Sequence, residues 1–447
     1  MVHRIHFVAP NNLWKHHMLN IRIACSTGVM LIAVALAAQD SALAAGFSLP
    51  EASTAGVGTA NALVANPDEI GAFPYNPAAM GFHDSSSVAL GTILIGPSFS
   101  VDTASGSHDS QGADWLTSPT FQMAFKVNDK WRVGLGLSAP FGLETRWPDG
   151  TFPALSGTVT LPIPPTYPKV PRSQPTASKL EILDFTPTAT FRVNDDLSLA
   201  AGLDVYWAKT AELDSTAAKL SGDGTGLGFN LSALYRQGPW SFGATFRSAA
   251  TLGLEGDFEP LSKTLVALKR LAPAQSAELD VDLPWRLQVG GRYAFDERLA
   301  VEFDVTRTGW SEFNDLEIKG KGTGILIFRD SNDWEDANAY RLSATYQLSE
   351  ATQLRAGYAY DETGQGDDHF SARVPDSDRH LFSLGVAQSL GHGFSLEASY
   401  MYVLGVDRDY RSSRHYTTGS DINGSDALDG DYSMDAHLIG LELVKVF

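Results

Sequence analysis

From about residue 84 onward, the chain repeats one pattern, in which apolar and polar side chains alternate over roughly ten residues before a turn interrupts them. In residues 197–207, for example, one face carries leucines, Val205 and Trp207, and the other carries Ser198 and Asp204. Because successive side chains of a strand point to opposite faces, a period of two indicates β-strands. Fourteen such segments occur, at residues 85–96, 118–127, 130–142, 180–193, 197–212, 226–236, 240–252, 278–295, 299–313, 337–348, 352–361, 378–390, 393–405 and 435–447.

The connections between these segments fall into two classes. Six are short and polar, at residues 128–129, 194–196, 237–239, 296–298, 349–351 and 391–393, and the others are long. Short turns at one rim and long loops at the other are typical of outer-membrane β-barrels, and aromatic residues flank the short turns as they do in interfacial girdles. The chain ends on Phe447, and a terminal aromatic on an alternating last strand is the usual signal for outer-membrane assembly. We therefore predict an all-β fold, a 14-stranded antiparallel transmembrane barrel over residues 85–447.

The first 44 residues predict a secretory signal peptide. A basic stretch that ends at Arg22 precedes an apolar run at 27–38, and Ala42-Leu43-Ala44 supplies a small-x-small cleavage pattern. The run is shorter than the roughly 20 apolar residues that a membrane helix needs. We expect cleavage after Ala44 or Ala45, and the chain starts at either Met1 or Met18.

Charge and cysteine content exclude several kinds of partner. The net charge of −19 disfavours a nucleic-acid partner, which would need basic patches. Acidic residues gather at 407–435, but the spacing from Asp421 to Gly424 does not fit a calcium-binding loop, so we predict no metal site and no cofactor. The only cysteine, Cys25, lies within the predicted signal peptide, so the mature chain forms no disulfide.

Residues 45–84 do not alternate and are rich in glycine and alanine. A barrel of fourteen strands with a polar lumen is wide enough to leak. A compact segment of small residues fits inside such a lumen, so we predict that residues 45–84 form a hatch. The alternative is a disordered periplasmic tail.

Several motifs occur in order along the mature chain. They are Ala45-Gly46-Phe47-Ser48-Leu49, the Ser/Gly-rich residues 53–60, Asn76-Pro77-Ala78, the segment from Leu283-Pro284 to Trp310-Ser311, residues 354–361, and Pro375-Asp376-Ser377-Asp378-Arg379 followed by Ser383-x-Gly385. In this order they resemble the outer-membrane long-chain fatty-acid and aromatic-hydrocarbon transporter family (FadL/TodX type). The resemblance covers the whole mature chain.

The resemblance implies a passive transporter, not an enzyme, that takes up long-chain fatty acids or similar hydrophobic molecules. It implies a monomer set in outer-membrane lipid and lipopolysaccharide. Ligand would be captured at the outer loops, move to a lumen pocket that includes the extreme N-terminus, and leave sideways through a gap made by a kink in the third strand. Aromatic-hydrocarbon uptake is the alternative within the same family.

Capture is expected at Leu261, Leu265 and Leu268, which form an apolar stripe between lysines in the connection after the seventh strand. The alternative is a helix that caps the barrel mouth with the same face buried. For the lumen pocket, the resemblance points to Phe47. Arg355 and Arg379 face the lumen by alternation and would meet a carboxylate there, unless they pair with acids of the wall such as Glu302, Asp304 or Glu397.

The third strand contains Pro140-Phe141-Gly142, where we expect the lateral opening. Proline cannot donate to a strand ladder and glycine permits a bulge, so both weaken the pairing at this point. The alternative is that these residues lie above the membrane, where the strand ends. In the hatch, Asn76-Pro77-Ala78 predicts a tight turn that holds the segment in place, because asparagine bonds its own backbone and proline restricts φ.

Three other classes of protein remain as alternatives, of which one is a purely structural or adhesive barrel. A barrel lipase would need a serine nucleophile beside a histidine, and the sequence contains no Gly-x-Ser-x-Gly elbow. A general porin would lack the glycine-rich hatch and would conduct ions freely.

Overall fold

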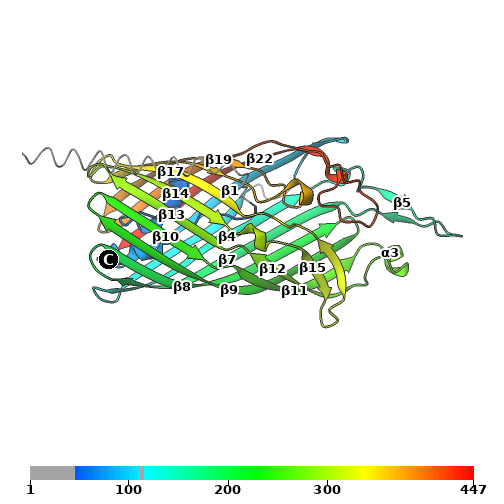
Figure 1. Ribbon diagram of the computed structural model, residues 1–447, viewed down its shortest axis with the longest axis horizontal. Helices are drawn as coiled ribbons and strands as arrows, with labels where there is room; N and C mark the ends of the chain where they lie inside the picture. The colour runs from blue at the N-terminus through cyan, green and yellow to red at the C-terminus, as the bar shows by residue number, and fades with distance from the viewer. Residues whose placement is uncertain (1–45, 111–114) are drawn as a thin grey trace, which may run out of the picture. The chain divides into compact units, whose positions relative to one another are not determined.

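A computed structural model describes residues 46–110 and 115–447, which form a closed β-barrel (Figure 1). The predicted signal peptide, residues 1–44, lies outside the described residues, as does Ala45. No helix of the described part of the chain is long and apolar enough to cross a membrane.

Fourteen antiparallel strands form the wall, and two of them are interrupted. In order around the barrel they are β1 (Ser87–Thr103), β3 (Leu116–Lys126), β4 (Trp131–Arg146), β7 (Pro175–Arg192), β8 (Leu197–Ser215), β9 (Ala218–Gln237), β10 with β11 (Trp240–Arg247 and Ala250–Pro260), β12 with β13 (Gln275–Leu283 and Arg286–Ala294), β14 (Leu299–Thr308), β17 (Ala337–Gln347), β18 (Thr352–Asp361), β19 (Arg379–Gly391), β20 (Phe394–Gly405) and β22 (Gly430–Val446). The last strand pairs with the first from Ser87↔Val446 to Asp102↔Asp431 and so closes the barrel. The predicted 14-stranded antiparallel barrel is therefore confirmed.

The wall differs from the prediction in two places. Segments 240–252 and 278–295 were expected to be continuous strands, but each is broken. The breaks lie opposite each other, because Arg247 pairs with Arg286 on one side and Ala250 pairs with Leu283 on the other. Pro284, which lies between Leu283 and Arg286, has no N–H to donate to the ladder.

Several strands also extend further toward the long loops than expected. β9, for example, begins at Ala218 rather than near residue 226, and the last strand begins at Gly430 rather than Asp435. The outer part of β9 reads Lys-Leu-Ser-Gly-Asp-Gly-Thr-Gly from residue 219, with few apolar side chains. Alternation is visible in the sequence only where one face of the strand is apolar and meets lipid. The parts of the strands that extend beyond the lipid were therefore not detected.

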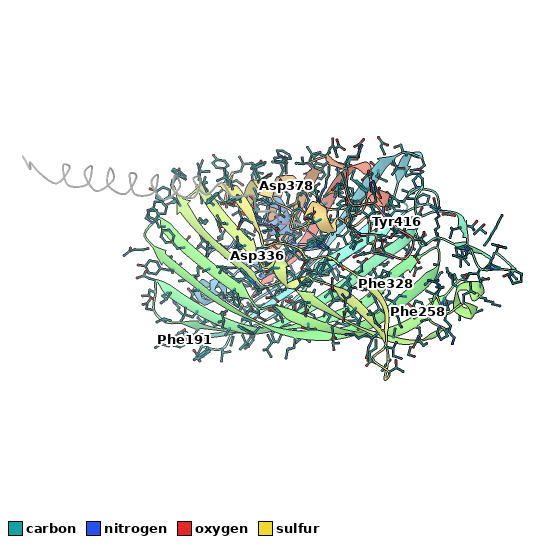
Figure 2. All side chains as sticks on the ribbon, turned by 45° about the vertical axis from the view of Figure 1, so that its right-hand side comes forward. Phe191, Phe258, Phe328, Asp336, Asp378 and Tyr416 are labelled. Atoms are coloured by element: carbon teal, nitrogen blue, oxygen red, sulfur yellow. The ribbon has the colours of Figure 1, made fainter. Side chains whose placement is uncertain are left out.

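The distribution of side chains is inverted relative to a soluble protein. Along β8, Leu203 and Trp207 are 48% and 42% exposed on the outer face, whereas Ser198 and Asp204 are fully buried toward the lumen. Aromatic rings gather near the short turns, where Trp131 packs 4.9 Å from Phe191. Phe191 is labelled near this end of the barrel in Figure 2. An apolar outer belt with aromatic girdles is what a strand wall in lipid requires.

The segment before β1, residues 46–84, lies inside the barrel, and we call it the hatch. It contains one short helix and two 3-10 turns, α2 (Thr54–Gly58), η1 (Ile70–Ala72) and η2 (Pro77–Phe82). α2 packs against β18, β19, β20 and β22, and η2 packs against β4, β7, β8 and β9. Glycines in the wall allow this close approach, because a Cβ added at Gly243 or Gly357 would overlap the hatch backbone.

The long loops carry the remaining short elements at the opposite end of the barrel from the short turns. These are β2 (Gly106–Asp109), β5 (Thr158–Thr160), β6 (Lys169–Pro171), α3 (Lys263–Ala267), η3 (Trp310–Glu312), β15 (Leu316–Gly320), β16 (Leu326–Asp330), η4 (Asp367–His369), β21 (Arg408–Tyr410) and η5 (Asp426–Leu428).

Candidate functional site

The wall is not fully paired between β3 and β4. Their ladder runs from Lys126↔Arg132 only as far as Phe121↔Leu137. Beyond this point β3 continues to pair with β1, up to Ile95↔Leu116, whereas β4 pairs only with its other neighbour, β7, with which it also pairs before this point. The loop-side half of β4 therefore has a free edge toward β3, and we call this place the β3–β4 gap.

The gap coincides with an irregularity in β4 itself. The register between β4 and β7 shifts between Ser138 and Phe141, so Ala139 and Pro140 are left out of the ladder. A bulge bends its strand and disrupts the pairing locally, and proline has no N–H to contribute. Pro140, Phe141 and Gly142, where the lateral opening was predicted, thus lie at the bulge and on the free edge.

The beginning of the hatch binds this free edge. The backbone N–H of Leu49 donates to the carbonyl of Pro140 at 2.8 Å, and the N–H of Gly142 donates to the carbonyl of Phe47 at 3.0 Å. Ser48 forms an isolated antiparallel bridge with Phe141. Residues 47–49 therefore act as a short strand that takes the place of β3.

Phe47 is anchored by aromatic rings. Its ring lies 4.9 Å from Trp310, 5.1 Å from Phe313 and 5.8 Å from Phe141, and the side chain is 2% exposed. Just before it, the N–H of Gly46 donates to a carboxylate oxygen of Asp376 at 2.6 Å. The extreme N-terminus of the described chain is thus held by packing and by one buried acid.

A cavity lies on the loop side of this segment, and we call it the loop-side cavity; its empty space, together with its opening to solvent, is about 760 Å³. Most of its wall is apolar, and its polar lining residues include Glu51, Glu144, Asp361 and Arg379. Glu144 is paired with Lys179 at 3.0 Å and with Arg146 at 2.9 Å. The cavity also touches residues 46, 48 and 49 of the hatch and Gly142 of β4.

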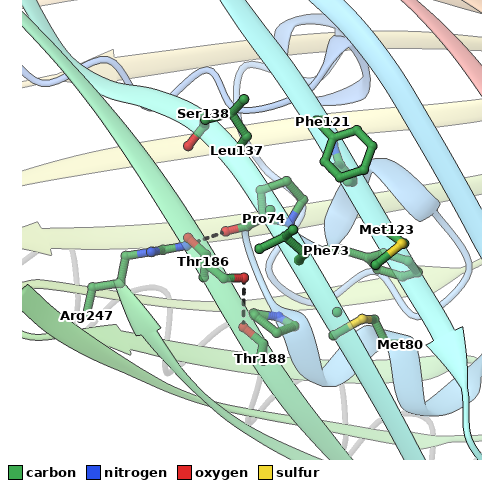
Figure 3. Close-up of a pocket in the computed structure, with 15 residues that line it drawn as sticks. Phe73, Pro74, Met80, Phe121, Met123, Leu137, Ser138, Thr186, Thr188 and Arg247 are labelled. Carbon is green, nitrogen blue, oxygen red and sulfur yellow. Dashed lines mark hydrogen bonds between the residues drawn. The ribbon is translucent and has the colours of Figure 1, made fainter. Parts of the chain in front are cut away.

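A second cavity of about 430 Å³ lies nearer the short turns, and we call it the turn-side cavity (Figure 3). It is lined by Phe73, Pro77 and Met80 of the hatch and by residues 134–138 of β4. The loop-side cavity touches β4 at residues 142–144 instead. The bulge of β4, with the hatch residues bound to it, therefore lies between the two cavities.

Arg247 of β10 forms the polar side of the turn-side cavity (Figure 3). It donates to the carbonyl of Pro74 at 3.1 Å and to Asp184 at 3.2 Å, and it also pairs with Asp204. Sequence reasoning missed this residue, because only its lumen-facing position in an alternating strand distinguishes it from other arginines.

The Asn76-Pro77-Ala78 turn cross-links the hatch to the wall. The Asn76 side-chain oxygen accepts from the N–H of Ala78 at 3.1 Å and caps η2, while its amide donates to the carbonyls of Val64 at 2.6 Å and Ala233 at 3.0 Å. Thr190 donates to the carbonyl of Pro77 at 3.0 Å. The turn thus contacts both β7 and β9.

The two candidate arginines lie in different places. Arg379 lines the loop-side cavity. Arg355 lines neither cavity and instead donates to Glu397 at 2.6 Å and to Glu69 of the hatch at 2.7 Å. The alternative considered for these arginines, pairing with a wall acid, describes Arg355.

The acids Glu302 and Asp304 also hold the hatch. They accept hydrogen bonds from the backbone N–H groups of Ala65, at 2.6 Å, and Val64, at 3.1 Å. The wall side chains that alternation directs into the lumen are therefore divided between anchoring the hatch and lining a cavity.

The capture candidates lie on the outer loop between β11 and β12. Leu261 is 46% exposed, Leu265 and Leu268 are half-buried, and the helix α3 is a single turn with no buried residue. Leu271, just beyond it, packs against the apolar cluster that contains Phe47. The loop thus presents an apolar surface near the cluster, but it lines neither cavity.

Sequence reasoning did not identify three further acids of the candidate site. Glu51 and Asp361 line the loop-side cavity, and Asp376 binds Gly46. Asp376 belongs to the Pro375–Arg379 motif, which was the available signal for it. Among the described residues, no group of three or more His, Cys, Asp or Glu is placed to hold a metal ion.

Comparisons with known proteins agree with this architecture. A family model described as "Outer membrane protein transport protein (OMPP1/FadL/TodX)" matches residues 34–447. The "Long-chain fatty acid transport protein" of Escherichia coli O6:H1 is 24% identical over 423 residues, which cover 83% of this chain and 90% of that protein. Two solved structures share the fold. A Pseudomonas aeruginosa FadL homologue has a TM-score of 0.74 at 20% identity, covering 90% of this chain and 99% of that one, and the P. putida toluene transporter TodX has a TM-score of 0.65 at 16% identity, covering 91% and 99%.

Proposed function

Because this chain belongs to the outer membrane transport protein family OMPP1/FadL/TodX, we propose that it takes up long-chain fatty acids or similar hydrophobic molecules across the outer membrane. The relatives named for long-chain fatty acid transport support this substrate class. We further propose that residues 1–44 are a signal peptide, that residues 45–84 are the hatch and that residues 85–447 form a monomeric barrel set in outer-membrane lipid and lipopolysaccharide.

One observation supports a lateral route above all others. Residues 47–49 of the hatch occupy the free edge of β4, at the bulge that lies between the two cavities. In this proposal, ligand is captured near Leu261, Leu265 and Leu268 and enters the loop-side cavity. When residues 47–49 leave β4, the ligand passes the bulge and exits sideways through the β3–β4 gap.

The backbone link between residues 47–49 and β4 is weak enough for such a movement, in which Phe47 must also leave its aromatic neighbours. Two backbone hydrogen bonds join them to β4, and each contributes about 0.5–1.5 kcal/mol. In lipid, an unpaired strand edge is costly, so an edge that lacks its neighbour needs a replacement partner. A replaceable partner supplied by the hatch keeps the edge satisfied at rest and still allows the gap to open.

The test is uptake of labelled oleate and labelled toluene by cells that lack their own transporter and express this chain. The wild type is compared with a Pro140→Ala, Gly142→Val double variant. Alanine restores an N–H to the bulge, and a Cβ at Gly142 would lie 2.9 Å from Cδ1 of Leu49, so valine crowds the hatch against the cavity. A Pro187→Ala, Gly291→Val double variant makes the same two changes on other strands, at residues that line neither cavity, and is the matched control.

We expect oleate to enter through the wild type and the control and to be blocked by the variant at the bulge. If the bulge variant transports oleate as well as the wild type does, the lateral route is wrong. If neither ligand enters while ions conduct freely, the protein is a porin and the transport proposal fails.

Aromatic-hydrocarbon uptake is the second candidate within the same family. The mostly apolar lining of the loop-side cavity and the shared fold with a toluene transporter favour it. If cells that express this chain take up toluene but not oleate, aromatic-hydrocarbon uptake is the function.

A further inference from the structure

Two charged residues face each other across strands at the rim of the loop-side cavity. Asp361 ends β18, Arg379 begins β19, and they are Cα partners in the register of the two strands. Both line the cavity. Such a cross-strand pair would ordinarily form a salt bridge, yet within the described residues neither side chain has a hydrogen-bond or ion-pair partner.

The rest of the polar lining is already occupied. Glu144 is paired with Lys179 and Arg146, and Glu51 accepts a hydrogen bond from Asn61 at 2.9 Å. Asp361 is only 7% exposed, so its carboxylate is largely withdrawn from bulk solvent and still lacks a donor. Buried polar groups without partners are costly, which indicates that a ligand supplies what the protein does not.

The apolar part of the same cavity extends from this pair toward the short turns. Leu381 follows Arg379 by two residues on β19 and pairs with Val403 of β20. Ile95 and Leu438 continue the apolar lining on β1 and β22. An elongated ligand would therefore place its hydrophobic body along these strands and its polar end between Asp361 and Arg379.

From this arrangement we propose that the loop-side cavity selects hydrophobic molecules that end in an uncharged hydroxyl group, such as long-chain alcohols or alkylphenols. A hydroxyl donates one hydrogen bond and accepts others. Its O–H donates to the Asp361 carboxylate, and its oxygen accepts from the Arg379 guanidinium. The inference rests on the proposed function and ranks the molecules that it admits, with alcohols and phenols bound more tightly than fatty acids, which this cavity accepts in their undissociated form.

A carboxylate does not meet these requirements. It accepts from Arg379, but it has nothing to donate to Asp361, and Arg379 is the one cation among the lining residues of a cavity whose acids include Asp361 and Glu51. Like charges close together in a poorly solvated site repel strongly. A fatty acid fits only in its undissociated form, and a plain hydrocarbon leaves both residues without partners.

The test is binding of matched ligands to the full mature protein in lipid nanodiscs at neutral pH. Dodecan-1-ol, dodecanoate and dodecane share one chain and differ only at its end. The pair 4-octylphenol and octylbenzene repeats the comparison for a hydroxyl group on an aromatic ring. A site built to bond a hydroxyl rejects analogues that lack it, so we expect each hydroxyl compound to bind at least about tenfold more tightly than its partners.

Single substitutions test which residues determine the preference for a hydroxyl group. Asp361→Asn replaces a carboxylate, which only accepts hydrogen bonds, by an amide that can also donate one. Dodecanoate should therefore bind to this variant about tenfold more tightly than to the wild type. Arg379→Gln should weaken the binding of dodecan-1-ol by about tenfold. The control is Glu362→Gln. Glu362 is the neighbouring acid, which accepts a hydrogen bond from Asn338 and does not line the cavity. Its substitution makes the same charge change as Asp361→Asn and should leave the order of affinities unchanged. Far-UV circular dichroism and resistance to unfolding in SDS confirm a folded barrel.

The outcomes separate this inference from the function on which it rests. If dodecanoate binds the wild type as tightly as dodecan-1-ol does, or if Asp361→Asn leaves their order unchanged, the hydroxyl selectivity is wrong while uptake of hydrophobic molecules stands. If the folded protein binds none of the five compounds, both proposals are overturned.

Discussion

Arg355 is predicted to be the strongest single ionic tether of the hatch. It is 3% exposed, and it donates to Glu397 of the wall at 2.6 Å and to Glu69 of the hatch at 2.7 Å. Arg355→Met keeps much of the volume but leaves the buried carboxylate of Glu397 and the partly buried carboxylate of Glu69 without their cation. Removing one partner of a buried ion pair costs about 3–5 kcal/mol.

This cost should appear as local opening of the hatch. The backbone ladder that joins β18 to its neighbours does not use the side chain of Arg355, so the wall stays paired. Because about 1.4 kcal/mol is a factor of ten, the opening equilibrium should rise by roughly 100-fold to 4,000-fold. The segment affected is the turn after Glu69, where the amides of Ala72, Phe73 and Asn76 donate to backbone carbonyls.

Hydrogen–deuterium exchange of the purified barrel in nanodiscs measures this opening amide by amide. A further variant that adds Glu69→Gln and Glu397→Gln removes the unpaired charges and should restore most of the protection, because neutral groups replace the whole ionic set. Arg411→Met, which breaks half-exposed pairs with Asp409 and Asp431 in an outer loop, is the control, since exposed pairs contribute only about 0–1 kcal/mol. Unchanged exchange after Glu69 in a folded Arg355→Met barrel would refute the reasoning.

Three further predictions concern the hatch and the outer loops. Asp376→Ala removes the acceptor for the Gly46 N–H and should cost about 1–3 kcal/mol at the start of the hatch, seen as faster exchange there with the wall unaffected. Gly243→Leu places a side chain where the hatch backbone lies, so the barrel should fold with a poorly seated hatch and pass ions in planar bilayers, whereas equal conductance to wild type would contradict the packing. In the outer loop, the backbone N–H of Tyr416 holds the pKa of Asp426 below its usual value. Its stabilisation is therefore present above the unfolded pKa of about 3.9 and is lost as pH falls through the folded pKa, so proteolysis of this loop should accelerate in acid, and Asp426→Asn should remove that step.

Much of the wall could be predicted from the sequence because its determinants are local. Period-two alternation identified fourteen strands, and the six short polar turns set their pairing into hairpins. Pro140 and Gly142 marked an irregular place in the third strand, because proline lacks a donor wherever it stands. The interruptions near Ser248 and Pro284 were missed, since alternation continues across a break that only the facing strand reveals.

The candidate site depended on contacts that no local pattern encodes. Alternation placed Arg355 and Arg379 in the lumen alike, but the partner that each one meets is set by where the hatch lies inside the closed barrel. Gly46 meets Asp376, 330 residues away, and Phe47 reaches Trp310 in a long loop and Phe141 in β4 of the wall. Strand periodicity reports which side of the wall a residue faces. Which polar groups are paired, and which stay open to a ligand, is decided by closure of the barrel around the hatch, because closure brings together side chains that are distant in the sequence.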